Sequence, residues 1–340
     1  MSTEASVAAV DGKRPTILEV ARLAGVSHQT VSRYFRAQDG LKPETKARVE
    51  AAVRELNYRP NLIARSMRTR KSGRLAVVVP TLAYNPARML AGASAVARDA
   101  GYVVDVLSIE GGVESRTGRL LDIIDLGQFE GVLSFAPILP SAAKEIARGA
   151  TIAVSADFDD AMRGIGELAD GSAVGELIER LAAQGHRRFF HVAGDQQFAS
   201  ARGRKQVYLD TIERLGLEST GVHDGDWSGE SGMAAVAGMS EDHPTAIIAA
   251  NDLVATGVLK AAHERGWRVP DDLSVTGWDD GPSSRFLIPS LTTVDINLEQ
   301  VGGNAMARLL GELGAPSAGL AQEPLTRIVW RDSTAAAPSD

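Results

Sequence analysis

The spacing of apolar residues changes along the chain and divides it into a helical head and a longer body. Between residues 15 and 59, apolar positions recur every three or four residues, which predicts short amphipathic helices. From residue 74 onward, short apolar runs alternate with helical stretches, which predicts parallel sheets joined by crossover helices. These runs are 75–80, 103–109, 131–135, 151–155, 189–194, 245–250 and 273–278. Their number predicts two such sheets, one before about residue 167 and one after it.

Three helices are predicted in the head, where they would close a small core. Gly25 follows the first helix and tolerates the left-handed conformation in which helices often end. Ser27 precedes the second helix, where its side chain can accept a hydrogen bond from an otherwise unpaired backbone N–H. The inward-facing residues of the three helices are Ile17, Val20, Ala21, Ala24, Val31, Tyr34, Phe35, Val49, Ala52, Val53 and Leu56.

The second helix of the head would turn polar side chains outward. Gln29 and Arg33 lie one turn apart on one face, with His28 in the first turn. Arginine can donate two hydrogen bonds to guanine, and glutamine can pair with adenine, in the major groove of DNA. This pattern is typical of the recognition helix of a helix-turn-helix motif. A helical hairpin with ordinary polar surface residues is the alternative interpretation.

The charge of the chain favours DNA binding when it is considered segment by segment. The 340 residues carry a formal net charge of -7 at pH 7, yet residues 11–74 contain fifteen Lys and Arg against six Asp and Glu. A basic head on an acidic body suits phosphate contact at one end of the chain. Residues 1–14 do not resemble a signal peptide and are expected to be a disordered tail. No window approaches the roughly 20 apolar residues of a membrane span, so we expect a cytoplasmic protein without a membrane partner.

Several kinds of chemistry are excluded or disfavoured by the residues present. The chain has no cysteine, which excludes disulfides, thiolate metal sites and cysteine catalysis. Its 6 histidines show no close ligand spacing, so no metal is expected. The segment GDWSG at 225–229 is not a nucleophile elbow, because its serine is out of register. We therefore expect neither a cofactor nor an enzyme.

Three segments of the head and the residues after it resemble the LacI/GalR (lactose repressor) family. They are TILEVARLAGVSHQTVSR at 16–33, KARVEAAVRELNYRPN at 46–61 and ARSM at 64–67. The resemblance implies a helix-turn-helix domain over residues 15–59 in which His28, Gln29 and Arg33 read a DNA operator. It places Thr16, Ser27 and Asn61 near phosphates, and it adds Thr30 and Ala64 to the DNA-binding set.

Residues 60–73 are interpreted as a hinge helix and linker. Pro60 can begin a helix, but the seven residues NLIARSM that follow are too short to form a stable helix alone. The resemblance implies that two such segments of a dimer fold together in the minor groove. Met67, where leucine is usual in the family, would then wedge between base pairs. A flexible basic linker is the alternative.

The same resemblance extends over the body and implies a periplasmic-binding-protein-like core of two Rossmann-like lobes. Lobe 1 would comprise residues 74–167 with 295–318, and lobe 2 residues 168–291 with 322–332, followed by a tail at 333–340. The chain would cross between the lobes near 163–168, 290–295 and 318–323. Ligands of such sheets bind outside the carboxyl ends of the strands.

Polar and aromatic residues follow the predicted strands of lobe 2. An aromatic ring beside Asp, Asn and Arg is a combination that binds a sugar, because the ring covers the apolar face and the polar groups hold hydroxyls. The resemblance assigns four of these residues to the effector pocket and treats Arg202 and Asp252 as structural neighbours. The four are Arg204, Trp227, Asn251 and Asp279. On lobe 1 the segments 84–87 and 155–157 align poorly, and the aromatic residue usual near Leu298 is absent.

The expected function is that of a homodimeric repressor of a palindromic operator. A mono- or disaccharide, with a weak preference for a galactoside because of the GDWS segment, would act as the inducer. In an alternative, a purine or another small ligand strengthens DNA binding as a corepressor. A third hypothesis is a cytoplasmic sugar-binding or sugar-processing protein whose basic head has no part in its function. No leucine heptad follows the body, so a dimer is expected rather than a dimer of dimers.

Overall fold

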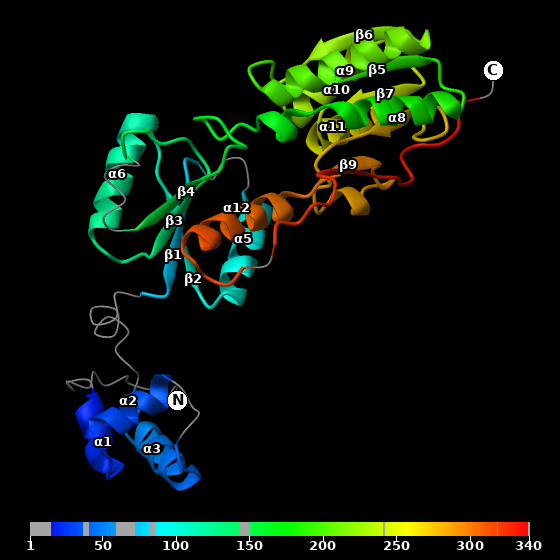
Figure 1. Ribbon diagram of the computed structural model, residues 1–340. Coiled ribbons are helices and arrows are strands. Elements are labelled where there is room, and N and C mark those ends of the chain that lie inside the picture. Colours follow the sequence, from blue (N-terminus) through cyan, green and yellow to red (C-terminus); the bar gives the residue numbers. More distant parts are fainter. Residues whose placement is uncertain are drawn as a thin grey trace, which may run out of the picture. The chain divides into compact units, whose positions relative to one another are not determined.

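The computed structural model describes residues 15–36, 41–58, 72–81, 86–142, 150–240, 242–317 and 319–338 (Figure 1). The chain separates into two compact units, one up to Ser72 and one from Gly73 onward. We describe each unit by itself.

The first unit is the three-helix head that the apolar spacing predicts. It consists of α1 (Ile17–Leu23), α2 (His28–Arg36) and α3 (Pro43–Glu55). Gly25 has a φ of 63°, as the prediction of a left-handed helix end requires. The three helices bury one apolar face each, with Val20, Val31 and Val49 fully inaccessible to solvent. The predicted orientation of α2 is therefore confirmed.

Lobe 1 of the second unit contains a parallel sheet of order β2-β1-β3-β4. Its strands are β1 (Arg74–Val79), β2 (Val103–Ser108), β3 (Gly131–Ser134) and β4 (Thr151–Val154). Alternate residues of β1 face opposite layers of the core, so that Val77 packs with α5 (Ala87–Asp99) and Val78 packs with α6 (Val113–Asp125). The helix α12 (Leu298–Glu312) lies far along the chain but packs beside α5 (Figure 1).

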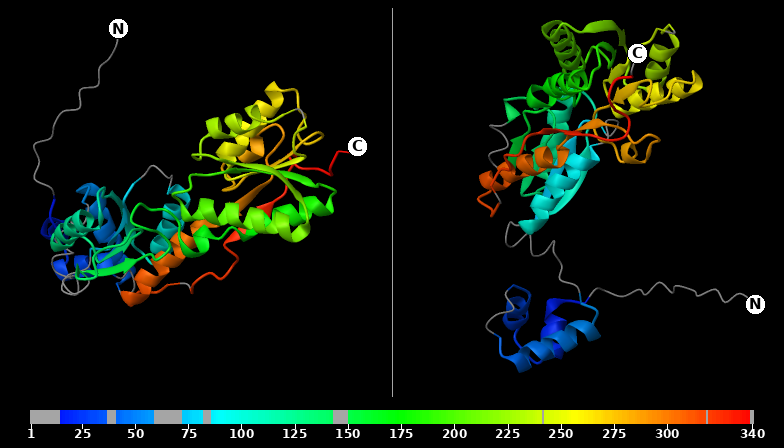
Figure 2. Two further views of the ribbon diagram at one scale, coloured as in Figure 1. Left: turned by 90° about the horizontal axis from the view of Figure 1, so that it is seen from above. Right: turned by 90° about the vertical axis from the view of Figure 1, so that its right-hand side faces the viewer.

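Lobe 2 contains a second parallel sheet of order β6-β5-β7-β8. Its strands are β5 (Arg188–Ala193), β6 (Glu218–Asp224), β7 (Ala246–Ala249) and β8 (Ser274–Thr276). The helices α8 (Ser172–Ala183) and α9 (Ala199–Leu215) share a core layer with Ile248. The helices α10 (Gly229–Ala237) and α11 (Asp252–Glu264) share the opposite layer with Ile247. Figure 2 shows the layers of this lobe from two further directions.

The remaining regular elements are two short helices and one antiparallel pair of strands. The short helices are η1 (Gly166–Ala169) and η2 (Ser284–Phe286). The strand β9 (Thr293–Ile296) pairs with β10 (Thr326–Val329). The fold class predicted from the sequence, a helical head and a two-lobe α/β core, is thus confirmed. Within the described ranges, every helix is too short or too polar to cross a bilayer.

Two features of lobe 2 differ from the sequence interpretation. The strand β6 was not predicted, because it is a polar edge strand in which no residue is fully buried. The segment 333–340, assigned to a tail, begins as part of lobe 2. Ser333 is inaccessible to solvent, and its hydroxyl donates a hydrogen bond of 2.6 Å to the carbonyl of Val275. Small and polar residues leave no apolar spacing in the sequence, so neither the strand β6 nor the burial of Ser333 could be predicted from it.

Close packing of α5 against α12 depends on glycine and gives a test of the fold. A Cβ at Gly302 would overlap the backbone carbonyl of Met89, whereas a Cβ at Gly303 would lie 3.4 Å from Val96. Gly302→Ala should therefore lower the free energy of unfolding in urea by roughly 1–3 kcal/mol. The matched Gly303→Ala should be neutral or stabilise by up to about 1 kcal/mol, since alanine favours helix. Equal effects of the two substitutions would contradict this packing.

Candidate functional site

The exposed face of α2 carries three polar side chains that are free to bind a partner. His28, Gln29 and Arg33 are exposed, and within the described head none of them forms a hydrogen bond or an ion pair. The opposite face is fixed by aromatic contacts, with the Tyr34 and Phe35 ring centroids 5.0 Å apart and those of Phe35 and Tyr58 5.7 Å apart. The core therefore determines which side chains α2 presents.

Three other predicted DNA-binding residues have structural roles at helix starts. The hydroxyl of Thr16 accepts a hydrogen bond from the Glu19 backbone in a capping box at the start of α1. The hydroxyl of Ser27 accepts a hydrogen bond of 3.2 Å from the Thr30 backbone, and the two hydroxyls lie 2.9 Å apart. These caps fix the first turns of α1 and α2, whose backbone N–H groups favour anions such as phosphate.

The hinge predictions lie outside the described residues. Asn61, Ala64 and Met67 all belong to the segment 59–71, so their proposed DNA contacts stay predictions.

In lobe 2, the predicted effector residues come together around Arg204. Its guanidinium lies 5.6 Å from the ring centroid of Trp227 and 4.0 Å from that of Trp278. Its Nη1 donates a hydrogen bond to the carbonyl of Ala250, at the end of β7. The amide Nδ2 of Asn251 donates to the carbonyl of Trp227 at 3.3 Å. The carboxyl ends of β6, β7 and β8 therefore all contribute to one cluster, as expected for a doubly wound sheet.

Trp278 is a member of this cluster that sequence reasoning missed. It is the last residue of the apolar run 273–278, which the spacing predicts as a strand. It is in fact buried, at 1% exposure, but it is in contact with Arg204 rather than only with apolar side chains. Its position directly before Asp279 was the available signal.

Trp227 is held by its backbone and by its neighbours. Its φ of 71° lies in the left-handed region, which is uncommon for a large side chain. Gly194 follows β5, and a Cβ there would overlap the Trp227 ring. Phe198 contacts the same ring edge-on, at 5.5 Å between centroids. The absence of a side chain at Gly194 thus allows the indole to pack over the end of β5.

Asn251 is already engaged in this structure. Its Oδ1 accepts a hydrogen bond of 2.8 Å from the Val254 backbone and caps α11, while its Nδ2 holds the Trp227 carbonyl. The residue therefore positions the cluster, and one hydrogen of Nδ2 remains for a ligand. Its assignment to the effector pocket stays a prediction.

Asp279 has an unusual conformation and environment. Its φ is 105°, and its backbone N–H donates a hydrogen bond of 2.7 Å to the carbonyl of Val294. Protein atoms displace water from the carboxyl and raise the pKa of Asp279 to about 7, although the positive charge of Arg204 opposes this rise. The residue as a whole is nevertheless exposed to solvent.

Asp252 and Arg202 act as structural neighbours, as expected. The Asp252 carboxylate accepts hydrogen bonds from the Gly281 backbone, at 2.7 Å, and from the hydroxyls of Ser284 and Thr293. This holds the turn after β8 against the start of α11. Arg202 is exposed and donates a hydrogen bond of 2.6 Å to the carbonyl of Gln196.

The lobe 1 side of the predicted pocket contributes less. Residues 82–85 lie outside the described ranges, so the segment 84–87 is described only in part. The hydroxyl of Ser155 donates a hydrogen bond of 2.6 Å to Oδ2 of Asp157. Leu298 packs partly buried against the apolar core.

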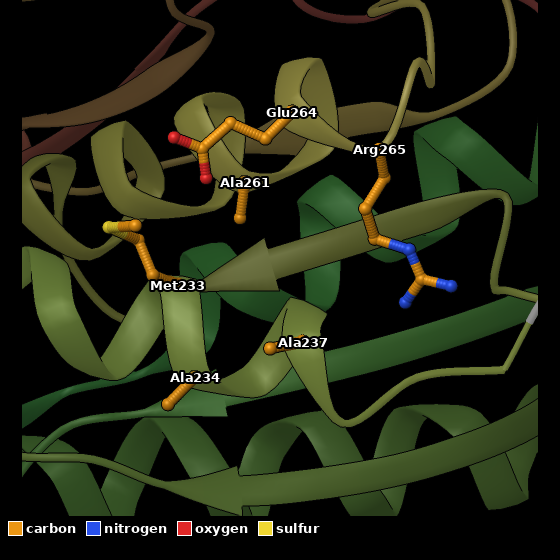
Figure 3. A pocket seen from close by; sticks show the side chains of 6 residues that line it. All are labelled: Met233, Ala234, Ala237, Ala261, Glu264 and Arg265. Carbon is orange, nitrogen blue, oxygen red and sulfur yellow. The ribbon is translucent and has the colours of Figure 1, made fainter.

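A separate depression lies between α10 and α11 and contains none of the predicted residues (Figure 3). Its volume is ≈ 340 Å³, and it is lined by Met233, Ala234, Ala237, Ala261, Glu264 and Arg265. Arg265 already donates hydrogen bonds to the carbonyls of Val236 and Met239. The Arg265 guanidinium in this depression is therefore already engaged by backbone carbonyls.

Comparison with known proteins finds matches to both the head and the body of the chain. Residues 16–61 match the model of "Bacterial regulatory proteins, lacI family", and residues 178–334 match that of "Periplasmic binding protein-like domain". The chain is 32% identical to the lactose operon repressor of Escherichia coli (strain K12) over 308 residues, which cover 88% of this chain and 84% of that repressor. It belongs to the LacI family.

Other relatives match this LacI-family chain over most of its length. The ribose operon repressor of Halalkalibacterium halodurans is 28% identical, over 94% of this chain and 97% of that protein. The solved structure of the lac repressor dimer bound to operator and the anti-inducer ONPF has a TM-score of 0.70 at 29% identity, covering 95% of this chain and all of that one. These relatives are transcriptional repressors, so this LacI-family chain is a DNA-binding transcriptional repressor and not an enzyme.

Proposed function

We propose that this repressor binds a palindromic operator as a homodimer and that a sugar bound around Arg204 releases it. The observation that carries the proposal is the face of α2, where His28, Gln29 and Arg33 are exposed without intramolecular partners. Two copies related by a two-fold axis would place two such faces on the halves of a palindrome. The repressor would act in the cytoplasm, where its DNA is.

The relatives support a sugar as the effector class. One relative is named a lactose operon repressor and another a ribose operon repressor. A solved complex of the regulator CelR with cellobiose has a TM-score of 0.56 at 26% identity, covering 94% of this chain and all of that one. We retain a weak preference for a galactoside, because Trp227 lies in the GDWS segment. A sugar can shift the equilibrium only by its difference in affinity for the two arrangements of the lobes.

A corepressor is the second candidate. The repressor PurR of Mannheimia succiniciproducens is 28% identical over 87% of this chain and 91% of that protein, and its name associates it with purines. The two candidates differ in the sign of the effect, since an inducer weakens operator binding and a corepressor strengthens it.

Substitution of Arg33 tests whether the exposed face of α2 reads DNA bases. The operator is first selected from a random duplex library with the unmodified protein, and affinity is then measured by fluorescence anisotropy. Arg33→Ala should lose roughly 1–3 kcal/mol of affinity for the selected duplex and most of its discrimination from random duplex. Arg54→Ala removes the same charge from α3 and should lower the affinity for the selected duplex and for random duplex by the same factor. Full discrimination by Arg33→Ala would show that α2 does not read bases.

Exposed apolar side chains indicate where two copies meet. Phe286 and Ile288 are 72% and 97% exposed, and Leu253 is 57% exposed. The hydrogen bonds from Gly281 and Ser284 to Asp252 keep η2 beside the start of α11, so these side chains lie on neighbouring segments. Large exposed apolar side chains on adjacent segments mark an interaction surface.

A charged substitution on this surface should lower the mass of the protein in solution from that of a dimer to that of a monomer. Ile288→Glu should convert the dimer to a monomer in analytical ultracentrifugation, because it would bury an unpaired charge at the interface. Leu126→Glu replaces a residue of lobe 1 that is 67% exposed and should leave the dimer intact. A dimer that survives Ile288→Glu, or that dissociates equally with Leu126→Glu, would place the interface elsewhere.

A further inference from the structure

Arg204 is a buried cation without an anionic partner. It is 4% exposed, and within the described residues its Nη1 donates a hydrogen bond to the neutral carbonyl of Ala250. No carboxylate of the described residues lies within ion-pair distance of it. The faces of Trp227 and Trp278 attract a cation but cannot accept its N–H groups in the way that an oxygen does. A buried charge in this state is unfavourable until a partner arrives.

Arg116 shows how the same chain treats a buried arginine that has a structural role. It is fully inaccessible to solvent, and it donates hydrogen bonds to the carbonyls of Gly111, at 3.0 Å, and Pro137, at 3.2 Å. It also pairs with the carboxylate of Asp160. The contrast between the two buried arginines shows that the environment of Arg204 lacks an anion that Arg116 has.

The atoms left without a partner around Arg204 are all hydrogen-bond donors. They are the Nε of Arg204, the Nε1 of Trp227 and the Nε1 of Trp278, each buried and unpaired in the described structure. The two other buried polar atoms without a partner, His191 Nε2 and Thr276 Oγ1, belong to strands β5 and β8. Unpaired buried donors cost free energy, so three in one cluster indicate a ligand that brings acceptors.

The acidic groups of the neighbourhood do not fill this need. The Asp252 carboxylate is occupied by three donors from the turn after β8 and from β9. The Asp279 carboxyl influences Arg204 electrostatically but makes no ion pair with it. The acidic residues Asp295 and Glu299 are paired with another cation, Arg88, which also donates a hydrogen bond of 3.3 Å to the Asp279 carbonyl.

We propose that the effector of this repressor is an acidic sugar whose oxyanion, a carboxylate or a phosphate, accepts hydrogen bonds from Arg204, Trp227 and Trp278. The inference rests on the proposed function, in that it takes this cluster to be the effector site. It narrows the effector from sugars in general to those that carry a negative charge. Both oxyanions suit an arginine that offers its Nε edge.

Matched pairs of sugars test the charge directly. Isothermal titration of the full chain compares D-galacturonate with D-galactose, which differ by a carboxylate, and D-glucose-6-phosphate with D-glucose, which differ by a phosphate. The acidic member of at least one pair should bind at least tenfold more tightly than its neutral counterpart. The first pair reports a carboxylate and the second a phosphate, so the two sources of the oxyanion are distinguished.

Substitution of one indole tests the donors. Trp278→Phe keeps a ring against Arg204 but removes the N–H, and it should weaken binding of the preferred acid several-fold. Trp267→Phe is the matched control, because Trp267 also has an arginine over its ring, Arg265 at 4.3 Å, but lies outside the cluster. Trp267→Phe should leave the affinity for the acid unchanged.

Substitution of the two buried arginines tests the missing anion. Arg204→Met should abolish the preference for the acid and leave or raise the Tm of the ligand-free protein, since it removes an unpaired charge. Arg116→Met should lower the Tm by roughly 5 °C or more, because it leaves Asp160 and two carbonyls without their partner. A fall in Tm for Arg204→Met as large as that for Arg116→Met would mean that Arg204 is structural.

The outcomes separate this inference from the proposed function. If the neutral member of each pair binds as tightly as the acidic one, or if neither acid binds, the inference is wrong. The repressor with a neutral sugar would still stand if a neutral sugar changes operator affinity. If the protein shows no preference for any duplex, the proposed function fails, whatever binds to lobe 2.

Discussion

The contact between the Arg204 guanidinium and the Trp278 ring lies at the centre of the proposed effector site of this repressor. Through it, α9 is joined to the end of β8, while the hydrogen bond to Ala250 joins it to the end of β7. The ring of Trp227, which follows β6, contacts the same guanidinium, and it fits there because Gly194 has no side chain. One buried side chain therefore contacts residues at three strand ends, where we propose that the effector binds.

The head depends on a different and simpler constraint, the burial of one apolar stripe on each of three short helices. A helix of nine residues has little stability of its own, so α2 gains its orientation from contact with α1 and α3. Because that orientation is set by Val31, Tyr34 and Phe35, the outward residues can differ without loss of the fold. Operator preference is thus separable from stability in this part of the chain.

Much of the fold could be predicted, because burial leaves a spacing that can be recognised in the sequence. The head and most strands follow from apolar periodicity. Strand ends indicated the region of the cluster, but the choice of Arg204, Trp227 and Asn251 came from the resemblance to the LacI/GalR family. The polar edge strand β6 and the buried Ser333 have no such spacing. Trp278 was missed for the converse reason, since a buried aromatic residue at a strand end resembles core. The partners of Asn251 depend on the conformation of Trp227, which composition does not reveal.

The central claim is that binding at α2 and binding around Arg204 are coupled through one equilibrium. Thermodynamic linkage requires the coupling to act in both directions with the same factor. The most direct measurement is therefore the dissociation constant of the best-binding sugar, by titration calorimetry, for the free repressor and for the repressor saturated with its selected operator. If the sugar acts as an inducer, it should bind at least tenfold more weakly to the operator complex than to the free repressor. Equal dissociation constants would show that the two sites are independent and would contradict it.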